Sequence, residues 1–297
     1  MTSTPAVLRT GIETDDVTVV VATRNRGDRL LETFPHHRAR TILVDNGSDE
    51  PLPDLAGPST VVRLGENRGA AARNVGVELA RTPYVAFADD DSYWTPGSLA
   101  RAAGLLRRHP RAALLAARVQ VGPDAREDPV SAQMAAAPLG TPPGAAGPSI
   151  LGFLACSIIV RRDAFLAVGG FEPRLFVYGE EALLAMDLAT AGHELSYVDD
   201  LVVRHFPRPG GRDNGARARI EARNRVLTAM LRRPLGVAAR ELGAALVTNP
   251  RGAADAVRQV GWARRHRRPL PPPVETDLRR LWTTRTAKNA PVDNPRH

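Results

Sequence analysis

Short apolar runs, rich in β-branched residues, recur through the first 120 residues or so, and stretches that favour helices separate most of them. Strands buried in a parallel sheet form such continuous apolar runs because helices cover both faces of the sheet. This alternation predicts an α/β fold, with a mostly parallel sheet flanked by helices. The expected strands are Val17 to Ala22, Thr41 to Val44, Thr60 to Leu64, Pro83 to Ala88 and Ala113 to Val119.

Three helices are expected between these strands. One lies near Arg29–Phe34 and is cut short by Pro35, which cannot continue a helix. A second runs from Gly69 to Ala80, where the residues favour helix and the apolar ones recur at helical spacing. A third opens at Pro96 and continues to about His109.

Residues 122–149 change character, because Gly, Pro and Ala dominate and periodicity is lost. This composition predicts a long mobile loop. A second structured block is expected after it. Its elements are a strand or two in Ile150–Val160, a short helix in Arg161–Phe171, a helix in Gly179–Ala191, and short strands at Leu195–Val198 and Leu201–Phe206.

The chain becomes helical and basic from Pro207. We expect an amphipathic helix with Ile220 and Leu227 on one side, then helices at Leu235–Val247 and Gly252–Arg265. The predicted organisation is a catalytic domain over residues 1–206 and a basic helical extension over residues 207–297. Within these, residues 1–15 are expected to be a loose tail, and the end from about 267 is expected to be loosely ordered.

The formal net charge of +8 is unevenly distributed. Residues 1–206 hold 20 Arg against 25 Asp and Glu, a net charge of −5, whereas residues 207–297 hold 20 Lys and Arg against 7 Asp and Glu, a net charge of +13. A basic tail of this kind fits nucleic acid, an anionic membrane surface or a phosphorylated substrate. A solvated helical face explains the same charges equally well.

Several classes of protein are excluded by composition. Cys156 is the single cysteine, so no intrachain disulfide and no cysteine-based zinc cluster can form, which fits a reducing cytoplasm. No run of about 18 apolar residues appears, and no membrane span is predicted. The N-terminus lacks the pattern of a secretory signal.

Carboxylates follow two of the expected strands. Asp89, Asp90 and Asp91 come directly after the fourth strand, and Asp45 follows the second. Ligands of such sheets bind at the carboxyl ends of strands. Adjacent carboxylates there can share Mg²⁺ or Mn²⁺, whose charge offsets their repulsion. The alternatives are a solvated acidic turn for the triplet and an ordinary turn at Asn46–Gly47 for Asp45.

Other candidate residues follow in order along the chain. Gly69 lies at a loop-to-helix junction with Arg73 nearby, and free N–H groups there can bind phosphate, although helix capping is the simpler explanation. Glu180 and Glu181 open a helix, where acids are stabilised by its dipole. Glu181 shares a face with Leu184 and Leu188, so it can point into a cleft and act as a general base. His205 ends an apolar strand.

Six segments, in order, resemble the family 2 glycosyltransferases, which have the GT-A fold, a Rossmann-like, mostly parallel sheet. They are VVVATRNR, ILVDNGSDE, LGENRGAAARNVGVELA, YVAFADDDSYWTPGSL, IIVRRDAFLAVGGFEPRLFVYGEEALLAMDLATAGHELSYV and VVRHF. The resemblance covers roughly Val17 to Phe206, with a weaker similarity to about Pro234. It implies transfer of a sugar from a nucleotide-diphosphate donor, with inversion and a Mg²⁺ or Mn²⁺ ion.

The resemblance also implies roles for individual residues. Glu181 matches the catalytic base, while Asp91 and His205 match the metal or diphosphate site, with Asp91 at the end of the DxD motif. The expected nucleotide-sugar-binding residues are Thr23, Arg24, Asp45, Asn67, Gly69, Arg73, Asp89 and Asp90. Among these, Asp45 matches the acid that contacts the base, and Asp89 lies near the ribose.

The sequence departs from the family pattern at the expected base. The usual motif is Glu-Asp followed two residues later by another Asp, whereas this chain has Glu180-Glu181 and then Leu183. A glutamate still accepts a proton but reaches one methylene further. The departure bears on the catalytic assignment and leaves the donor-site assignment unchanged.

Two other functions fit parts of the sequence. A sugar-1-phosphate nucleotidyltransferase also uses a parallel sheet and acidic metal ligands, but it usually has a glycine-rich basic signature that VVVATRNRGDRL does not supply. A non-enzymatic binder of nucleic acid or membrane surfaces would use the basic extension, but no nucleic-acid-binding motif appears, and we expect no nucleic-acid partner.

The expected partners are therefore a nucleotide-sugar donor and an acceptor. Asp45 favours a UDP or dTDP donor over GDP, and the acceptor is a glycan, a lipid-linked molecule or a small molecule. We expect a cytoplasmic protein, with peripheral contact at the inner face of the membrane as a further option through the basic helices.

Overall fold

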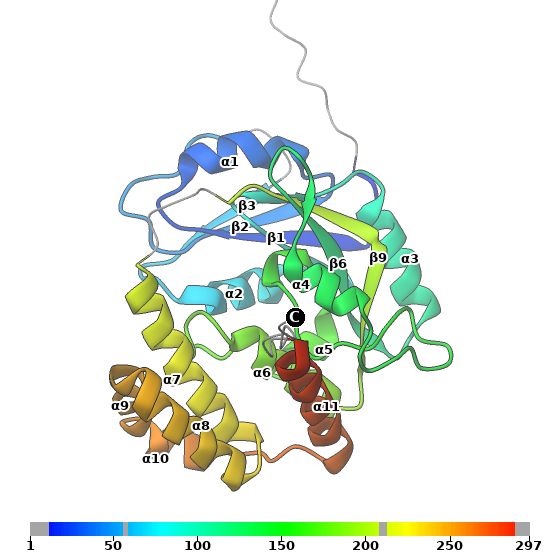
Figure 1. Ribbon diagram of the computed structural model, residues 1–297. Helices are drawn as coiled ribbons and strands as arrows, with labels where there is room; N and C mark the ends of the chain where they lie inside the picture. Colours follow the sequence, from blue (N-terminus) through cyan, green and yellow to red (C-terminus); the bar gives the residue numbers. More distant parts are fainter. Residues whose placement is uncertain (1–11, 56–58, 208–212, 289–297) are drawn as a thin grey trace, which may run out of the picture.

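The computed structural model describes residues 12–55, 59–207 and 213–288. The expected tail over residues 1–15 lies mostly outside this part of the chain. The described residues form a mixed α/β structure in which a curled, mostly parallel sheet is flanked by helices and followed by a group of C-terminal helices (Figure 1). The fold class expected from the sequence is confirmed.

Four parallel strands build one half of the sheet, in the order β3-β2-β1-β4. The β1 strand pairs with β2 and β4 so that Thr23 lies opposite Asp45, and Ala22 lies opposite Asp89. Both acidic strand ends therefore meet at one edge of the sheet. The bounds are β1 (Val17–Thr23), β2 (Arg40–Asp45), β3 (Ser59–Arg63) and β4 (Tyr84–Asp89).

The other half of the sheet continues as β8-β6-β9-β5. The β8 strand is antiparallel to β4 and β6, β6 is parallel to β9, and β5 is antiparallel to β9. The bounds are β5 (Ser92–Trp94), β6 (Ala112–Val121), β8 (Ile158–Arg161) and β9 (Glu194–His205), and the short β7 (Arg126–Glu127) pairs with β6.

Helices cover both faces of the sheet (Figure 1). Alternate residues of β1 enter different apolar clusters, since Val20 belongs to one, and Val19 and Val21 belong to the other. The helices are α1 (Gly27–Thr33), α2 (Ala72–Leu79), α3 (Ser98–Arg108), α5 (Arg162–Ala167) and α6 (Glu180–Thr190), with 3₁₀ turns at Phe34–His36, Gly69–Ala71 and Ala155–Ser157.

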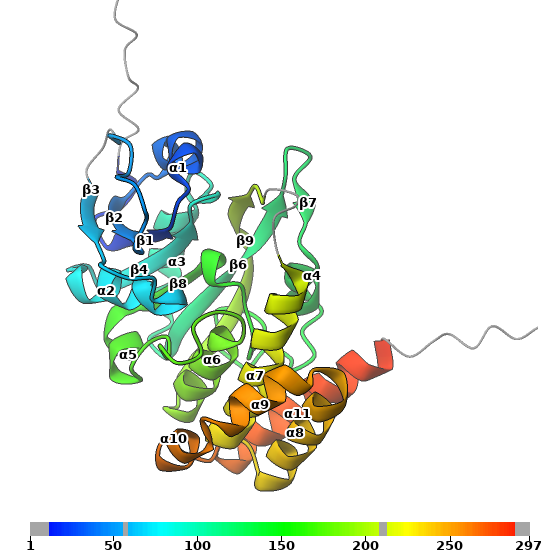
Figure 2. The ribbon, with the colours of Figure 1, turned by 90° about the vertical axis from the view of Figure 1, so that its left-hand side faces the viewer.

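Within the described residues, helices α7 to α11 form the C-terminal part, in which α7 and α11 contact α6 (Figure 2). Leu183 of α6 shares an apolar cluster with Leu227 and Trp262. Arg232 binds Asp187 of α6 through two nitrogens, at 2.5 and 2.9 Å. The bounds are α7 (Asn214–Arg232), α8 (Leu235–Thr248), α9 (Pro250–Val257), α10 (Val260–Arg265) and α11 (Pro272–Lys288).

Three expectations about local structure are wrong. Residues 122–149 include β7 and α4 (Pro129–Ala135), whose first turn is capped by Asp128, so they are not a structureless loop. Within the end from about 267, residues 272–288 form α11, whose Glu275 pairs with Arg233, and residues 289–297 lie outside the described part of the chain. The two expected strands around Asp199–Asp200 are one strand, since β9 absorbs these residues in a bulge against β6.

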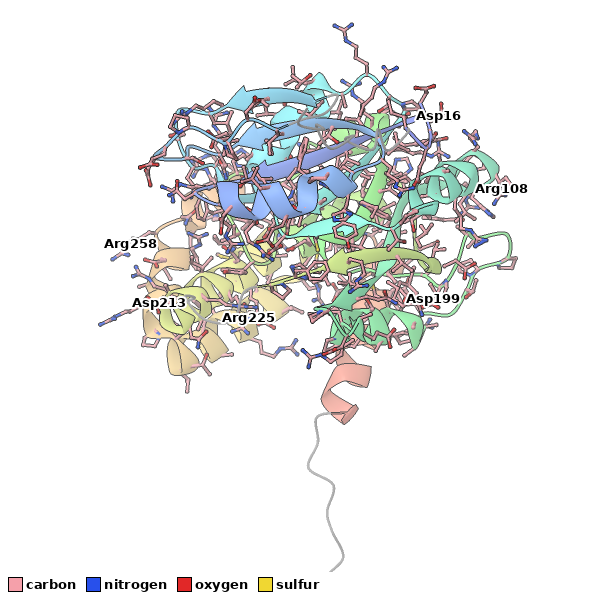
Figure 3. The ribbon with its side chains drawn as sticks, turned by 90° about the horizontal axis from the view of Figure 1, so that it is seen from above. Asp16, Arg108, Asp199, Asp213, Arg225 and Arg258 are labelled. Carbon is pink, nitrogen blue, oxygen red and sulfur yellow. The ribbon has the colours of Figure 1, made fainter. Side chains whose placement is uncertain are left out.

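Smaller differences concern element ends. Only β8 forms within Ile150–Val160, and the helix expected over Gly252–Arg265 is divided into α9 and α10. Within the described residues no helix is both long and apolar enough to span a membrane. Charged side chains project from the rim of the molecule, among them Arg108 on α3 and Arg258 beyond α9 (Figure 3).

Candidate active site

The three consecutive aspartates have three different environments. Asp89 pairs with Arg73 of α2. Asp90 accepts hydrogen bonds from Thr23 Oγ1 at 3.0 Å and Arg26 Nη1 at 3.1 Å. Asp91 lies 3.2 Å from His205 Nε2. The mutual repulsion of adjacent carboxylates is relieved because each one finds a separate cationic or hydrogen-bonding partner.

Asp90 is a buried anchor of the strand ends. Burial raises its pKa to about 6, although the nearby Arg26 guanidinium opposes the shift. Its backbone carbonyl also accepts a hydrogen bond from Thr33 Oγ1 at 2.7 Å. Asp90 thus links the end of β4 to β1 and α1, and together with its partner Thr23 it stabilises the structure of the site.

Asp91 and His205 form a pair that depends on sheet pairing. The β5 strand, directly after the triplet, pairs with β9 so that Ser92 lies opposite His205. Burial opposes the charged imidazolium, but the hydrogen bond and the charge of Asp91 outweigh it and raise the pKa of His205. Burial alone would raise the pKa of Asp91, but His205 and Arg26 outweigh burial and lower this pKa below its usual value.

A possible cation position lies beside this pair. One ligand atom from each of Asp89, Cys156 and His205 lies within 4.8 Å of the other two. The Nδ1 atom of His205 is buried without a hydrogen-bond partner in the part of the chain that the structure describes. Carboxylate oxygens are typical ligands of Mg²⁺ and Mn²⁺. Burial raises the pKa of Cys156 well above its usual range, so the neutral thiol is a weak ligand.

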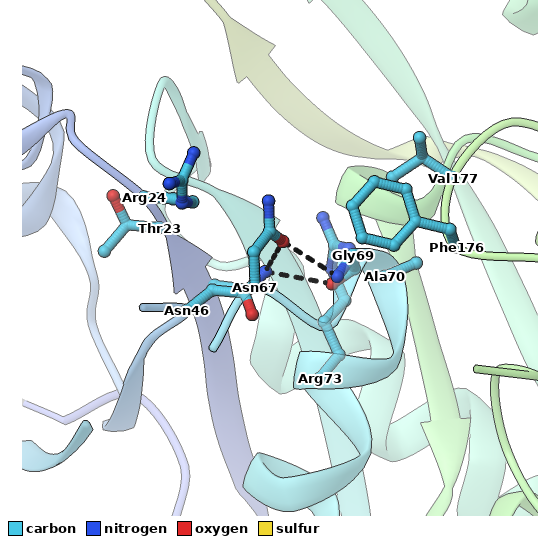
Figure 4. A pocket seen from close by; sticks show the side chains of 10 residues that line it. Thr23, Arg24, Asn46, Asn67, Gly69, Ala70, Arg73, Phe176 and Val177 are labelled. Atoms are coloured by element: carbon cyan, nitrogen blue, oxygen red, sulfur yellow. Dashed lines mark hydrogen bonds between the residues drawn. The ribbon is translucent and has the colours of Figure 1, made fainter. Parts of the chain in front are cut away.

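A cavity of about 200 Å³ lies beside the triplet, between β1 and the start of α2 (Figure 4). Gly69 allows the chain to close around it, because this residue has a φ of +58° and a Cβ atom there would lie 2.3 Å from the carbonyl oxygen of Phe176. The lining residues are Ala22, Thr23, Arg24, Asn46, Asn67, Gly69, Ala70, Arg73, Phe176 and Val177.

Arg73 connects this cavity with the candidate cation position and with the start of α6. Its side chain is only 12% exposed and is paired with Asp89. Burial opposes the charge of the guanidinium, but Asp89, Glu180 and Glu181 raise its pKa further above its usual value. One arginine therefore balances negative charge from two separate elements.

The two glutamates of α6 differ in exposure. Glu180 is 4% exposed, and its Oε2 atom has no hydrogen-bond partner among the described residues. Burial and the neighbouring Glu181 raise the pKa of Glu180 to about 8. Glu181 is only partly buried, and its carboxylate accepts a weak hydrogen bond from the N–H of Gly179 at 3.4 Å.

The segment that leads into α6 is held in an unusual conformation. Phe176 and Tyr178 both have positive φ angles, of 67° and 68°, which non-glycine residues rarely adopt. Asn224 of α7 stabilises this segment, because its Nδ2 atom lies 2.8 Å from three carbonyl oxygens between Leu175 and Tyr178. Backbone strain of this kind often accompanies functional sites.

Asp45 is separate from this group of residues. It is buried, its Oδ1 accepts a hydrogen bond from the N–H of Ser48, and its Oδ2 lies 3.5 Å from Arg63 Nε. It lines a second cavity of about 480 Å³. The other lining residues are Leu43, Pro51, Leu52, Pro53, Asp54, Leu55, Val61 and Arg63.

The structure brings most of the expected site residues to one edge of the sheet. Thr23 contacts Asp90, and Arg73 contacts Asp89, while Arg24, Asn67 and Gly69 line the cavity between them. Arg26, Cys156 and Asn224 were not predicted as site residues, and Glu180 was expected only to stabilise the start of its helix. Arg26 follows the first strand within TRNR, a position that could have identified it, whereas the sequence gives no signal for Asn224.

Solved structures of sugar transferases share the architecture described above. The chain superposes on GalNAc-T7 with UDP, GalNAc and Mn²⁺ at a TM-score of 0.59 and 15% identity, covering 84% of this chain and 56% of that one. It superposes on the mannosyltransferase PcManGT from Pyrobaculum calidifontis, in complex with GDP-Man and Mn²⁺, at a TM-score of 0.54 and 18% identity, covering 94% and 89%. The fold is that of the GT-A class.

The family follows from the sequence match. The model of glycosyl transferase family 2 matches residues 18–169, just over half of the 297 residues, and the chain therefore belongs to that family of enzymes. A pre-mycofactocin glycosyltransferase of Mycobacterium tuberculosis is 33% identical over 210 residues, covering 67% of this chain and 44% of the relative. The chain thus spans less than half the length of that relative.

A second relative is covered more completely. The N-acetylglucosaminyl-diphospho-decaprenol L-rhamnosyltransferase of Mycobacterium tuberculosis is 28% identical over 249 residues, which cover 67% of this chain and 79% of that protein. Both relatives are glycosyltransferases by name.

Proposed function

We propose that this chain transfers a sugar from a nucleoside-diphosphate sugar to an acceptor hydroxyl, with inversion at the anomeric carbon and with a divalent cation at the donor site. The observation that carries the proposal is the meeting of Asp89, Arg73, His205 and the carboxylates of α6 at the carboxyl edge of the sheet. This edge is where α/β sheets bind ligands.

The donor is expected to span the two cavities. Asn67, Gly69 and Arg73 would bind the diphosphate in the smaller cavity, with Arg24 at its border. The larger cavity beside Asp45 combines prolines and leucines with a buried acid, which suits a nucleobase. A pyrimidine base is our preferred ligand there, although the similar structures contain both UDP and GDP-Man.

The residues present fit a divalent cation, as the two similar structures with Mn²⁺ also suggest. Asp89, Asp91 and His205 would hold Mg²⁺ or Mn²⁺, which when bound offsets the negative charge of the departing diphosphate. Arg26 lies within reach of Asp90 and Asp91, so it would share in balancing charge at this edge.

Glu181 is proposed as the general base. It would accept the proton of the acceptor hydroxyl as the hydroxyl oxygen bonds to the anomeric carbon and the bond to the diphosphate breaks. Glu180 and Arg73 would fix its surroundings, because Glu180 is buried beside it and Arg73 interacts with both carboxylates. Alignment of the hydroxyl with the sugar supplies a large part of the rate.

We propose that the acceptor hydroxyl belongs to a glycan or to a lipid-linked molecule. One relative acts, by its name, on a diphospho-decaprenol-linked acceptor, and the basic C-terminal helices suit an acceptor with phosphate groups.

The test is a panel of UDP-, dTDP- and GDP-sugars with Mn²⁺ or Mg²⁺, scored by thermal shift and by slow hydrolysis of the donor. The true donor should raise the unfolding temperature most, because ligand binding stabilises the native state. The configuration of the released sugar, followed by NMR, should be inverted. No response to any nucleotide sugar, together with pyrophosphate exchange from a nucleoside triphosphate and a sugar phosphate, would instead indicate a nucleotidyltransferase.

A further inference from the structure

The outer face of α8 is apolar. Leu235, Leu246 and Val247 are 71%, 55% and 85% exposed. Positions i, i+4 and i+11 lie on one side of a helix, so Leu235, Ala239 and Leu246 form a stripe, and Val247 lies beside it. A surface helix normally presents its polar side to water. Helix α8 instead exposes large apolar side chains on its outer side while its buried side is also apolar.

The inner face of α8 explains why Leu235, Leu246 and Val247 remain exposed. The helix is buried through two alanines, Ala238 and Ala245, which lie two turns apart on the side that faces the protein. Small residues allow α8 to pack closely on its neighbours α7 and α9 (Figure 2). Leu242 also packs against the apolar cluster on this side, whereas Leu235, Leu246 and Val247 are not needed for packing within this part of the chain.

The surroundings of this apolar face are basic. Residues 235–268 contain seven arginines against one glutamate and one aspartate, a formal excess of five positive charges. Arg240 of α8 itself and Arg251 at the start of the neighbouring α9 are exposed. The aspartate, Asp255, is already paired with Arg219 and Arg258. Exposed apolar side chains flanked by arginines are characteristic of helices that lie in the surface of an anionic membrane.

The size of the face favours a membrane over a second copy of the chain. The 14 residues of α8 give a helix about 21 Å long and about 10 Å wide, or roughly 200 Å² of surface. A stable protein interface buries about 800 Å² on each partner. A single apolar stripe is too small for such an interface, but it is sufficient to enter the boundary between headgroups and acyl chains.

The helix is also connected to the candidate site. Asn224 of α7 holds the segment between Leu175 and Tyr178, which contributes Phe176 and Val177 to the smaller cavity. From Asn224 to the end of α7 at Arg232 is about 12 Å along the helix axis, and α8 begins directly afterwards. A bilayer in contact with α8 would thus lie a few helical turns from that segment.

We propose that α8 docks flat on an anionic lipid bilayer through Leu235, Leu246 and Val247, and so brings the site to an acceptor carried by the membrane. The identity of the acceptor rests on the proposed function, whereas the docking itself rests on the exposed face of α8 and its arginines.

The test is sedimentation of the full chain with vesicles of phosphatidylglycerol and phosphatidylcholine, compared with vesicles of phosphatidylcholine alone. The wild-type protein should bind the anionic vesicles and be released by high salt. The double variant Leu246→Gln/Val247→Gln should bind at least about tenfold more weakly, because it loses two apolar side chains from the buried face. Leu31→Gln/Leu79→Gln, at residues 55% and 48% exposed elsewhere, is the matched control and should bind like wild type.

Several results would overturn the proposal. Vesicle binding that is equal in the α8 variant and in wild type would do so, as would no binding to anionic vesicles. A concentration-dependent dimer that is lost in the α8 variant would assign the face to a second copy instead. Donor hydrolysis in solution should be unchanged in the α8 variant, so a failure of docking is distinguishable from a failure of the proposed sugar transfer.

Discussion

Charged side chains at the strand-end site are buried and paired over long range, whereas many of those on the C-terminal helices are exposed and paired locally. At the site, Asp90 and Asp91 are almost fully buried, and their partners come from elements far away in the sequence. On the C-terminal helices, pairs such as Arg217–Glu221 join neighbouring turns and face water. Buried charges cost free energy unless they are paired, whereas exposed pairs contribute little. Substitutions should therefore have large effects at buried charges and small effects at exposed pairs such as Arg217–Glu221.

The largest effect is expected from Asp91→Asn. Loss of the charge that holds His205 and the proposed cation should lower sugar transfer about 10³-fold, because several kcal/mol of charge stabilisation is lost. Steady-state rates with the preferred donor measure this. Asp200→Asn is the control, since Asp200 is 70% exposed and paired only at the surface, and it should keep wild-type activity. Equal rates for both variants would show that the triplet is not a donor site.

Glu181→Gln should lower transfer by about 10² to 10⁴-fold while donor binding persists, because a general base is removed and the cavities are unchanged. Glu180→Gln is the companion variant, since it keeps the size of the buried side chain. Rates and donor dissociation constants separate the two roles. If Glu181→Gln remained active and Glu180→Gln were inactive with intact folding, the base would be Glu180.

The two kinds of ion pair can be compared directly through stability. Arg232→Ala breaks the buried pair with Asp187 that attaches α7 to α6, and it should lower the free energy of unfolding by about 3 to 5 kcal/mol. Arg217→Ala breaks an exposed pair on the same helix and should cost less than about 1 kcal/mol. Denaturant titrations measure both. Similar losses would mean that burial does not distinguish the two kinds of ion pair.

A further prediction concerns the pH dependence of stability. The pKa of Glu180 rises from 4.5 to about 8 on folding, so the native state binds more protons than the unfolded state between these values. The free energy of unfolding should therefore fall as pH rises from 4.5 to 8, by at most about 1.4 kcal/mol per pH unit, and level off above. In Glu180→Gln this contribution should be absent. An identical pH dependence in both proteins would show that Glu180 does not titrate in this way.

Much of the sheet was predictable because buried strands leave apolar runs in the sequence. The positions of Asp45 and Asp89 after their strands also predicted that both residues lie at the same edge of the sheet. The register of β1 with β2 and β4 confirms this. The short β5 strand and its pairing with β9, which joins Asp91 to His205, could not be predicted, since three residues carry no periodicity.

The remaining misses arise from tertiary contacts. Helix α11 has weak periodicity and depends on the pairing of Glu275 with Arg233. Asn224 stabilises the segment before α6 from 46 to 49 residues away, and an asparagine within a basic helix gives no sign of this. The burial that distinguishes Glu180 from Glu181 also appears only once α6 is packed.

The most direct test of the strand-end site is a titration of Mn²⁺ followed by electron paramagnetic resonance, with UDP, dTDP and GDP present in turn. We expect the wild-type protein to bind about one Mn²⁺ ion, with the signal of free Mn²⁺ falling when the correct nucleotide is added. Asp89→Asn and Asp91→Asn should abolish this uptake, and Asp200→Asn should not. Uptake of Mn²⁺ that is the same in all four proteins would contradict the assignment of this edge as the site for the donor and its metal ion.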